Sequence, residues 1–572
     1  SNPFLPTAVR NALMAAGQTT FRMGRLYNDV ATSTTRNENA TFRAAVGAKG
    51  ELGSKWSFDA YAEYGRGVLD FRLNDLAITP NFLAALYAVR DANGQIVCGP
   101  VARNPNLSAA QRPQVEAGCV PYNPFGAFRG SDAARDYMTD DHVGRTVIRQ
   151  DVGAVNFRGT PLDLPAGPVS VALGYEHRHV RGTDTVTPDT FRRSIIGAFA
   201  AANRLPSTGA VTVNEGYFEG EIPLLSGAPM AKSLSLNGAV RYTDYSTSGG
   251  VTTWKAGFVY EPFDGLRLRG TRSRDIRAPN TAELFGVAPE GATTQTNPIT
   301  GGSATVRTQA VSNPNLEPEV ADTLTFGAVV QPTQISGLRL AVDYYDIKID
   351  GVIISVSAAE VLRRYYLLGQ TDVYAPFIEF VPTTVNPTGF QKVSSPFVNA
   401  SSLHTRGIDA EAAYRFPTVS GEVNLSVLGS YVIDLKTTDI SGTLDSAGGT
   451  TPELRLTGNI GYRADRFATN LQIRYNSSRK YSDTLVGPED PGYDPALPTS
   501  ISRNRLAGAI YFTLSASYDV LSDKRLQVFG VVNNLFDRNP PLGAYALVGQ
   551  TATVNYYDFV GRTFRIGVRA SL

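Results

Sequence analysis

Long hydrophobic runs are missing from this sequence. A membrane-spanning helix needs about 18 consecutive apolar residues, and the best stretch, residues 352–368, is interrupted by Glu360, Arg363 and Arg364. Residues 1–6 also lack the basic and apolar regions of a secretory signal peptide. We therefore expect no helical membrane span, and we expect the chain to be either a processed mature protein or a fragment.

The sequence also lacks an excess of one charge sign, and it lacks catalytic motifs. The chain has 53 Lys and Arg against 52 Asp and Glu, so it has no basic surplus that would attract nucleic acid. It has only 4 His and 2 Cys. We find no nucleophile–base pair, no cluster of metal ligands and no glycine-rich phosphate loop. We therefore expect neither enzymatic activity nor a cofactor.

The sequence is rich in alternating segments. Apolar and small or polar side chains alternate in residues 169–175, 234–242 and 338–344, and each segment ends in a tyrosine. Successive side chains of a strand face opposite sides of a sheet, so each segment has one apolar and one largely polar face. Aromatic residues at the ends of apolar faces are typical of strands that cross a membrane.

One of these segments makes the expected orientation testable. Leu340 and Val342 should face lipid, whereas Arg339 and Asp343 should face the lumen of a barrel. An arginine at Val342 should then cost about 2–4 kcal/mol if that position lies near the midplane of the bilayer. The same change at Ala341 should be much milder.

The connections between the segments alternate between short and long. Five short turns lie at 164–168, 263–265, 336–337, 418–422 and 522–524, and long polar stretches lie at about 73–145, 185–210, 285–317, 354–397, 439–449, 485–501 and 540–554. Such alternation is typical of outer-membrane barrels. A soluble propeller or sandwich would be more evenly spaced.

The fold class that we predict is an all-β, transmembrane antiparallel β-barrel with about 17 strands in this chain. The expected strands are 20–49, 55–72, 146–163, 168–184, 211–223, 232–247, 251–262, 265–284, 319–332, 336–353, 398–417, 421–438, 450–464, 466–484, 502–521, 524–539 and 555–572. An odd number cannot close an antiparallel barrel of a single bacterial chain. We therefore expect further strands upstream of Ser1.

Several motifs resemble those of TonB-dependent receptors, particularly large members from α-proteobacteria. They are residues 271–280, 283–285, 312–319, 405–411, 532–537 and 560–569, and residues 2–6 and 221–224 extend the match toward the N-terminus. The last strand alternates as outer-membrane assembly signals do, although it ends in Leu572 where the usual residue is Phe. The order and spacing of the motifs extend the resemblance across the chain.

This resemblance implies a barrel of about 22 strands around a folded N-terminal plug. Residues 1–572 would then be one incomplete β-barrel domain in the outer membrane of a Gram-negative bacterium, without its plug, its TonB box and about five strands. These missing parts could lie in the same polypeptide or in a second chain. The implied function is uptake of a siderophore, carbohydrate or other nutrient, energised by the TonB–ExbB–ExbD complex, with outer-membrane lipid and lipopolysaccharide as further partners. The alternatives are a passive porin-like channel without a plug and a structural barrel that binds a surface partner.

Two cysteines and two histidines stand out. Cys98 and Cys119 share one long loop, and because the periplasm is oxidising we expect a disulfide between them rather than two free thiols. Such a bridge is worth roughly 3 kcal/mol. His177 and His179 continue the apolar face of residues 169–175, so we expect them near lipid headgroups rather than in a metal site.

Two further groups are candidate contacts of a ligand or of the plug. The first is a charged group at the end of a strand, which could line the lumen or brace the following loop: Arg272, Arg274, Asp275 and Arg277. The second lies near a capping box, Ser357 to Glu360, which predicts a short helix over 358–368. Its aromatic residues could contact a ligand or, more simply, pack the loop: Tyr365, Tyr366, Tyr374 and Phe377.

Overall fold

The structure is a computed structural model of the whole chain. It describes residues 2–18, 21, 23, 32–108, 111–126, 130–200, 202–288, 290–384, 386–440, 442–497, 499–541 and 556–571. Parts of the first and last expected strands, and Leu572 itself, lie outside these residues.

Within the described residues, seventeen long strands form one antiparallel sheet in which each strand pairs with the next. They are β1 (Thr34–Leu52), β2 (Trp56–Ala77), β5 (Thr139–Leu164), β6 (Gly167–Val186), β7 (Ser207–Ala228), β8 (Ala231–Tyr245), β9 (Gly249–Phe263), β10 (Leu266–Arg277), β13 (Glu319–Val330), β14 (Leu338–Ser355), β16 (Phe390–Thr418), β17 (Gly421–Asp439), β19 (Leu454–Arg463), β20 (Phe467–Asn476), β23 (Ala509–Asp519), β24 (Leu526–Asn533) and β25 (Thr563–Ala570). The predicted fold class is confirmed.

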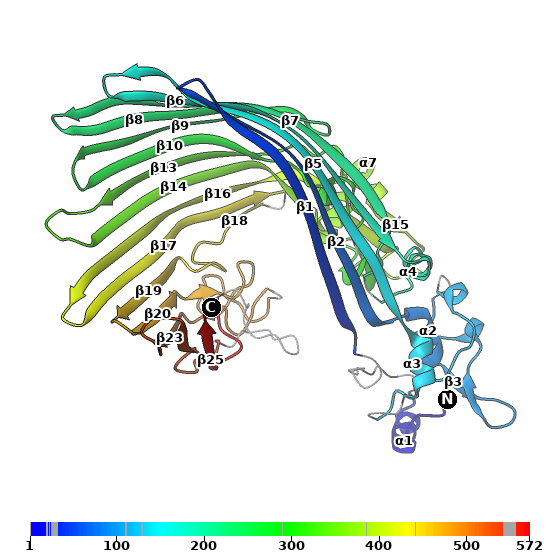
Figure 1. Cartoon of the computed structure of the whole chain (residues 1–572). Coiled ribbons are helices and arrows are strands. Elements are labelled where there is room, and N and C mark those ends of the chain that lie inside the picture. Colours follow the sequence, from blue (N-terminus) through cyan, green and yellow to red (C-terminus); the bar gives the residue numbers. More distant parts are fainter. Residues whose placement is uncertain are drawn as a thin grey trace.

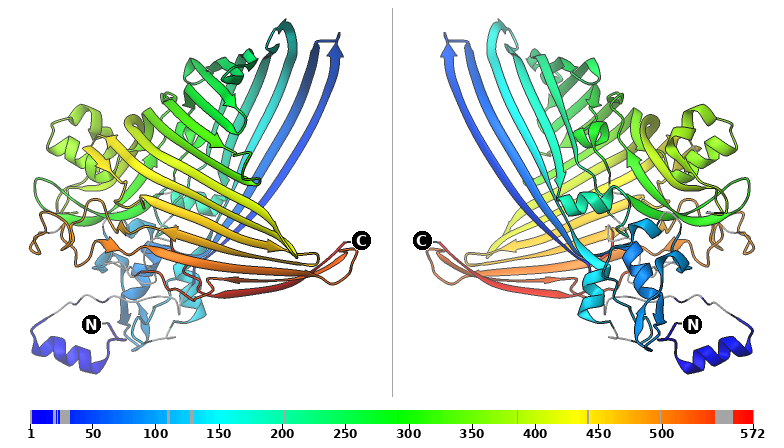
Figure 2. Two further views of the ribbon diagram at one scale, coloured as in Figure 1. Left: turned by 90° about the vertical axis from the view of Figure 1, so that its left-hand side faces the viewer. Right: turned by 90° about the vertical axis from the view of Figure 1, so that its right-hand side faces the viewer.

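The sheet curves into a trough (Figures 1 and 2). β1 pairs with β2 and β25 pairs with β24, but β1 and β25 do not pair with each other in the described part of the chain. Each of these two strands therefore presents one open edge.

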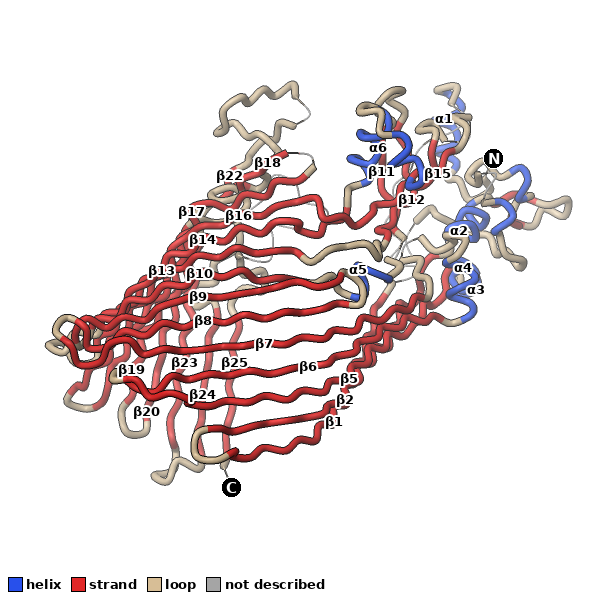
Figure 3. Tube along the Cα trace, turned by 90° about the horizontal axis from the view of Figure 1, so that it is seen from above, coloured by secondary structure: helices blue, strands red, loops and turns tan. Residues whose placement is uncertain are grey.

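Hairpin turns and long loops lie at opposite ends of the strands (Figure 3). The long-loop end carries α2 (Thr79–Leu86), α3 (Asp132–Met138), α4 (Pro188–Ser194), α5 (Thr281–Phe285), α6 (Ala358–Tyr366) and α7 (Thr371–Tyr374), and α1 (Thr7–Ala15) precedes β1. It also carries the short strands β3 (Ala88–Arg90), β4 (Ile96–Cys98), β11 (Gly291–Thr296), β12 (Ser303–Val311), β15 (Ile378–Phe380), β18 (Gly442–Asp445), β21 (Arg479–Lys480) and β22 (Arg505–Leu506). Among the described helices none is long and apolar enough to cross a membrane.

Several strand boundaries differ from the prediction; the expected strands 502–521 and 555–572, for example, begin only at Ala509 and Thr563. The expected strand 265–284 ends at Arg277, and helix α5 follows at 281–285. Pro279 interrupts the strand, and Asn280 with Glu283 forms a capping box that starts the helix. The expected strand 466–484 ends at Asn476. The helix predicted over 358–368 is confirmed as α6.

The convex face of the sheet is apolar. Phe326 and Val342 are 51% and 49% exposed on this face. Other strands add further exposed side chains to it: Val46, Phe218, Val240 and Val427. The side chains at the other alternate positions of β14 lie on the concave face. Asp343 is one of them, and it bonds Arg269 there. This confirms the orientation expected for residues 338–344.

Candidate functional site

On the concave face, polar side chains of next-but-one strands form hydrogen bonds across the sheet. Arg269 of β10 donates to Asp343 of β14 at 2.8 and 2.6 Å, across the intervening β13. This is sterically allowed because β13 has Gly327 at that point, where a Cβ atom would lie 1.9 Å from the Asp343 carboxylate. On the other side of the trough, Tyr217 donates to Asn156 at 2.8 Å across β6. Such bonds make the concave face a polar lining.

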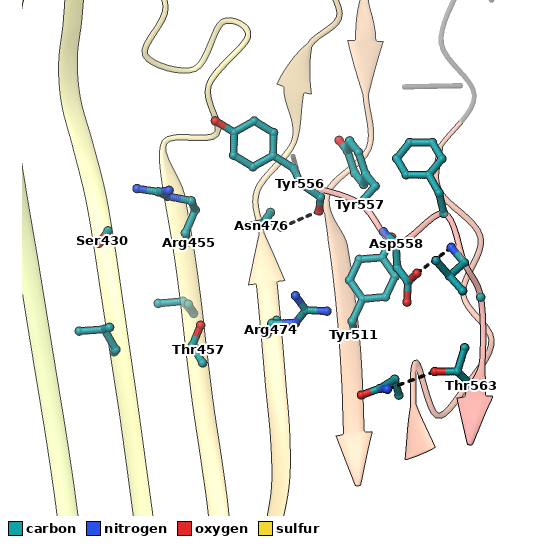
Figure 4. A pocket seen from close by; sticks show the side chains of 16 residues that line it. Ser430, Arg455, Thr457, Arg474, Asn476, Tyr511, Tyr556, Tyr557, Asp558 and Thr563 are labelled. Carbon is teal, nitrogen blue, oxygen red and sulfur yellow. Dashed lines mark hydrogen bonds between the residues drawn. The ribbon is translucent and has the colours of Figure 1, made fainter. Parts of the chain in front are cut away.

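A hollow of about 790 Å³ lies on this face at the long-loop end of β17 to β25 (Figure 4). The floor is built from side chains at alternate positions of neighbouring strands: Arg455 and Thr457 of β19, Arg474 and Asn476 of β20, and Tyr511 of β23. Residues 556–561 cover one side of it.

Two hydrogen bonds hold the segment above the floor, and a third closes a turn within the segment. The amide of Asn476 donates to the carbonyl of Tyr556 at 2.9 Å. The backbone N–H of Asp558 donates to the hydroxyl of Tyr511 at 3.2 Å. The carboxylate of Asp558 accepts from the backbone N–H of Val560 at 2.9 Å, so this acid is engaged within its own turn. The hollow is therefore a formed site with a fixed aromatic wall.

The two arginines in the hollow have no carboxylate partner among the described residues. Arg474 lies with its guanidinium carbon 5.9 Å from the ring centre of Tyr511, and Figure 4 shows it directed toward that ring. Arg455 lies opposite Ser430 and Asn476, which are both neutral. Arginine presents a planar fork of donors suited to carboxylate or phosphate groups. The hollow is thus suited to an anionic ligand with a flat or aromatic part.

The charged group around β10 is divided between the two faces. Arg272 and Arg274 lie directly opposite Leu324 and Asp322 on the convex face, and Arg274 bonds Asp322 at 3.1 and 2.9 Å. Arg277 lies on the concave face. The placement of Arg272 and Arg274 thus differs from a lumen lining, which was one of the two alternatives for this group.

Of the concave members of this group, Arg277 braces the loop that follows, whereas Asp275 bonds within β10. Arg277 bonds Glu319 of β13 at 2.5 Å and Glu283 of α5 at 3.1 Å. Asp275 accepts from the hydroxyl of Ser273 at 2.7 Å. These contacts agree with the structural alternative stated for the group, and contact of Asp275 or Arg277 with a ligand or a plug stays a prediction.

The aromatic residues of the loop after β14 pack on a small core. The core consists of Val306, Val356, Ala358, Val361, Leu362, Ile378, Phe390 and Val393. The four aromatic candidates all pack against it: Tyr365, Tyr366, Tyr374 and Phe377. They are partly buried, so any contact with a ligand through their outer edges stays a prediction.

The loop after β2 is closed as predicted, because Cys98 and Cys119 form a disulfide. A second link fastens this loop to α4. Glu116 accepts from Arg192 at 2.9 Å and from Arg193 at 3.0 Å. Burial alone would raise the pKa of Glu116, but the hydrogen bonds from Arg193 and Arg192 lower this pKa to about 2.

The histidines in the middle of β6 lie on the convex face. His177 bonds Asn214 at 2.8 Å and His179 bonds Thr212 at 3.0 Å. Tyr175 lies on the same face, closer to the hairpin turn, and is 48% exposed. Among the described residues, no group of three or more His, Cys, Asp or Glu could hold a metal ion.

A curved antiparallel sheet with an apolar convex face, a polar concave face and loops of unequal length at its two ends defines an outer-membrane β-barrel. The family model "TonB dependent receptor-like, beta-barrel" matches residues 5–535. The chain belongs to this family of outer-membrane receptors and transporters.

Two solved structures show the same fold. The FrpB iron transporter from Neisseria meningitidis (F3-3 variant) is similar over 93% of this chain and 63% of its own, with 12% identity and a TM-score of 0.50. The outer membrane transporter YddB from Escherichia coli is similar over 94% of this chain and 63% of its own, with 10% identity and a TM-score of 0.58. The chain thus spans less than two thirds of the length of either transporter. No curated protein sequence matches it.

Proposed function

We propose that this chain is the barrel part of a transporter that takes up a scarce anionic ligand across the outer membrane. The observation that carries this proposal is the pair Arg455 and Arg474, which lack carboxylate partners among the described residues and face a tyrosine-lined hollow. A ferric siderophore combines negative charge with flat chelating groups, and the iron transporter among the similar structures supports this class. A carbohydrate or another nutrient with an acidic group is the broader alternative.

The proposed uptake is energised from the inner membrane by the TonB–ExbB–ExbD complex, through a plug inside the barrel. We further propose that residues 1–572 act as one barrel domain and that additional strands pair with the open edges of β1 and β25. An unpaired backbone group inside lipid costs several kcal/mol, so such edges are unfavourable in a bilayer. The additional strands belong either to the same polypeptide or to a second chain.

Uptake of radioactive iron by cells that carry the complete receptor tests the function. The probes are ferric citrate, a ferric catecholate and a ferric hydroxamate, each given with and without a protonophore. We expect uptake of at least one complex, its loss with the protonophore, and a fall of about tenfold, corresponding to about 1.4 kcal/mol, when Arg455 and Arg474 are both changed to Gln. Arg339→Gln is the matched control, because Arg339 is exposed on the concave face near the turn end of β14. The proposal would be contradicted if the protonophore left uptake unchanged, or if Arg339→Gln reduced uptake as much as the double variant does.

Conductance in planar bilayers separates this function from a passive channel. A plugged transporter should stay nearly closed, whereas an open barrel of this size should pass large currents. Large steady currents through the complete receptor would favour the porin-like alternative.

A denaturing gel of the purified, folded barrel tests the strand partners. After heating, with N-terminal sequencing of every band, we expect either one polypeptide longer than this chain or a second band. A folded, heat-modifiable barrel made of residues 1–572 alone would refute the proposed pairing at β1 and β25.

A further inference from the structure

Three arginines stand side by side on the convex face of neighbouring strands. Arg66 of β2 lies directly opposite Arg149 of β5, and Arg149 lies directly opposite Arg181 of β6. These strands run next to one another in Figure 1. Because adjacent strands are about 4.8 Å apart, three positive charges occupy one row, which we call the arginine row.

The arginine row has no ion-pair partner among the residues that the structure describes. The Nε atom of Arg66 is shielded from solvent and has no hydrogen-bond partner there. On the same face, Asp151 is one outward-facing position further toward the turns, so one negative charge stands near three positive ones. Like charges directly opposite each other destabilise a sheet. The row is therefore destabilising by itself, and binding of an anion from outside the described residues would relieve the repulsion.

The same strands show how this face neutralises an arginine internally. Two rows further toward the long loops, Arg145 of β5 lies opposite Asp70 of β2 and bonds both its carboxylate oxygens, at 2.5 and 3.0 Å. An acidic residue opposite Arg149 would give the same result, yet both its cross-strand neighbours are arginines. The contrast distinguishes the arginine row from an ordinary charged belt.

The depth of the row identifies the kind of partner. Tyr64 precedes Arg66 by two positions on the same face, and Tyr175 lies three outward-facing positions before Arg181. Aromatic girdles mark the boundary between lipid tails and headgroups, so the arginine row lies just beyond it at the long-loop end. In this family of barrels, the long loops face the cell exterior. The row is therefore level with headgroups of the outer leaflet.

We propose that the arginine row binds the phosphate groups of a lipopolysaccharide-type glycolipid in the outer leaflet. Arginine forms bidentate, charge-assisted hydrogen bonds with phosphate. Basic clusters beside the membrane are a recurrent means of recognising anionic headgroups. The lipid phosphates would supply the negative charge that the row lacks, so the barrel would be stabilised when this lipid surrounds it.

The test compares the thermal stability of the wild type and of Arg149→Gln with and without lipid A. The complete receptor, purified in neutral detergent, is heated with and without diphosphoryl lipid A, and loss of the heat-modifiable gel band reports unfolding. Without lipid A, Arg149→Gln should raise the midpoint because it removes repulsion. With lipid A, the wild type should gain more than the variant, and native mass spectrometry should show at least tenfold weaker lipid A binding by the variant.

Arg145→Gln is the matched control, because Arg145 is paired with Asp70 on the same two strands. It should lower the midpoint by the same amount with and without lipid A. Equal stabilisation of wild type and Arg149→Gln by lipid A would overturn the proposal. So would equal stabilisation of the wild type by dephosphorylated lipid A, or by inorganic phosphate alone, since the first would exclude phosphate recognition and the second would exclude a lipid partner.

Discussion

Two adjacent residues of β17 allow the orientation of the sheet to be tested with one chemical change. Val427 lies on the convex face and is 41% exposed, whereas the next residue, Leu428, faces the concave side and is 54% exposed. Val427 is the central residue of the alternating outward series from Val423 to Tyr431. An arginine at Val427 should meet lipid tails, while an arginine at Leu428 should meet water in the lumen.

The size of the effect follows from the depth of Val427. An arginine at the midplane of a β-barrel costs about 2–4 kcal/mol. This is about a 30- to 900-fold loss in the folding equilibrium, because 1.36 kcal/mol corresponds to a factor of ten. Leu428→Arg keeps its charge in a polar, open lining, so its cost should stay below about 1 kcal/mol.

Folding of the complete receptor into phosphatidylcholine vesicles at increasing urea, followed by the heat-modifiable gel band, measures both variants. Val427→Arg should lower the urea midpoint clearly, and Leu428→Arg should leave it nearly unchanged. Equal shifts, or a larger shift for Leu428→Arg, would refute the assignment of faces. Ala341 is a poor control for Val342, contrary to the expectation from the sequence, because its side chain is only 7% exposed and an arginine would be crowded there.

Two further predictions concern the loop after β2. Intact-mass analysis after alkylation without reductant should find no modified thiol at Cys98 or Cys119, and two modified thiols after reduction; two modified thiols before reduction would exclude the bridge. The pKa of Glu116 lies at about 2 in the folded loop against an ordinary value of 4.5, so its contribution to stability is full above pH 4.5 and is lost as the pH falls toward 2. After allowance for screening by solvent, this contribution is about 1–2 kcal/mol. The protection of residues 78–138 against hydrogen exchange, corrected for the intrinsic exchange rate at each pH, should therefore fall between pH 4.5 and 2 in the wild type. In Glu116→Gln this protection should be lower already at pH 7 and should not fall further in acid; the same acid response in both proteins would contradict the role of Glu116.

Alternation in the sequence was sufficient to predict the strands. A strand that separates lipid from water must repeat every two residues, and all seventeen expected strands correspond to strands of the sheet. Boundaries were harder where local signals compete, as at Pro279, which ends β10 before helix α5. The loop core around Phe390 joins segments that are far apart in the sequence, so periodicity could not reveal it.

The same alternation could have separated the charged group near β10. Arg272 and Arg274 share the parity of Leu268, which the apolar pattern directs outward, whereas Asp275 and Arg277 have the other parity. Grouping these residues by closeness in sequence overlooked this period of two.

The hollow near β25 could not be found in this way. Arg455 and Arg474 are on separate strands, and their meeting depends on the pairing register of β19 with β20. Register is set by turn geometry as well as by the apolar pattern. Each arginine alone looks like any other lumen-facing charge, so only the assembled sheet shows that neither has a carboxylate partner among the described residues.

Pairing therefore distinguishes the two kinds of arginine on this barrel. Arg145 with Asp70, and Arg269 with Asp343, satisfy their donors within the sheet and brace neighbouring strands. An arginine without a carboxylate neighbour keeps its donors for something outside the strands. Two groups of such arginines face different surroundings: in our proposals the hollow faces the lumen, where a ligand passes, and the arginine row faces the outer leaflet, where lipid headgroups lie. We therefore expect the two sites to act independently. Removing positive charge from the hollow should impair uptake without changing the stabilisation by lipid A. Removing positive charge from the arginine row should change the stabilisation by lipid A without abolishing uptake.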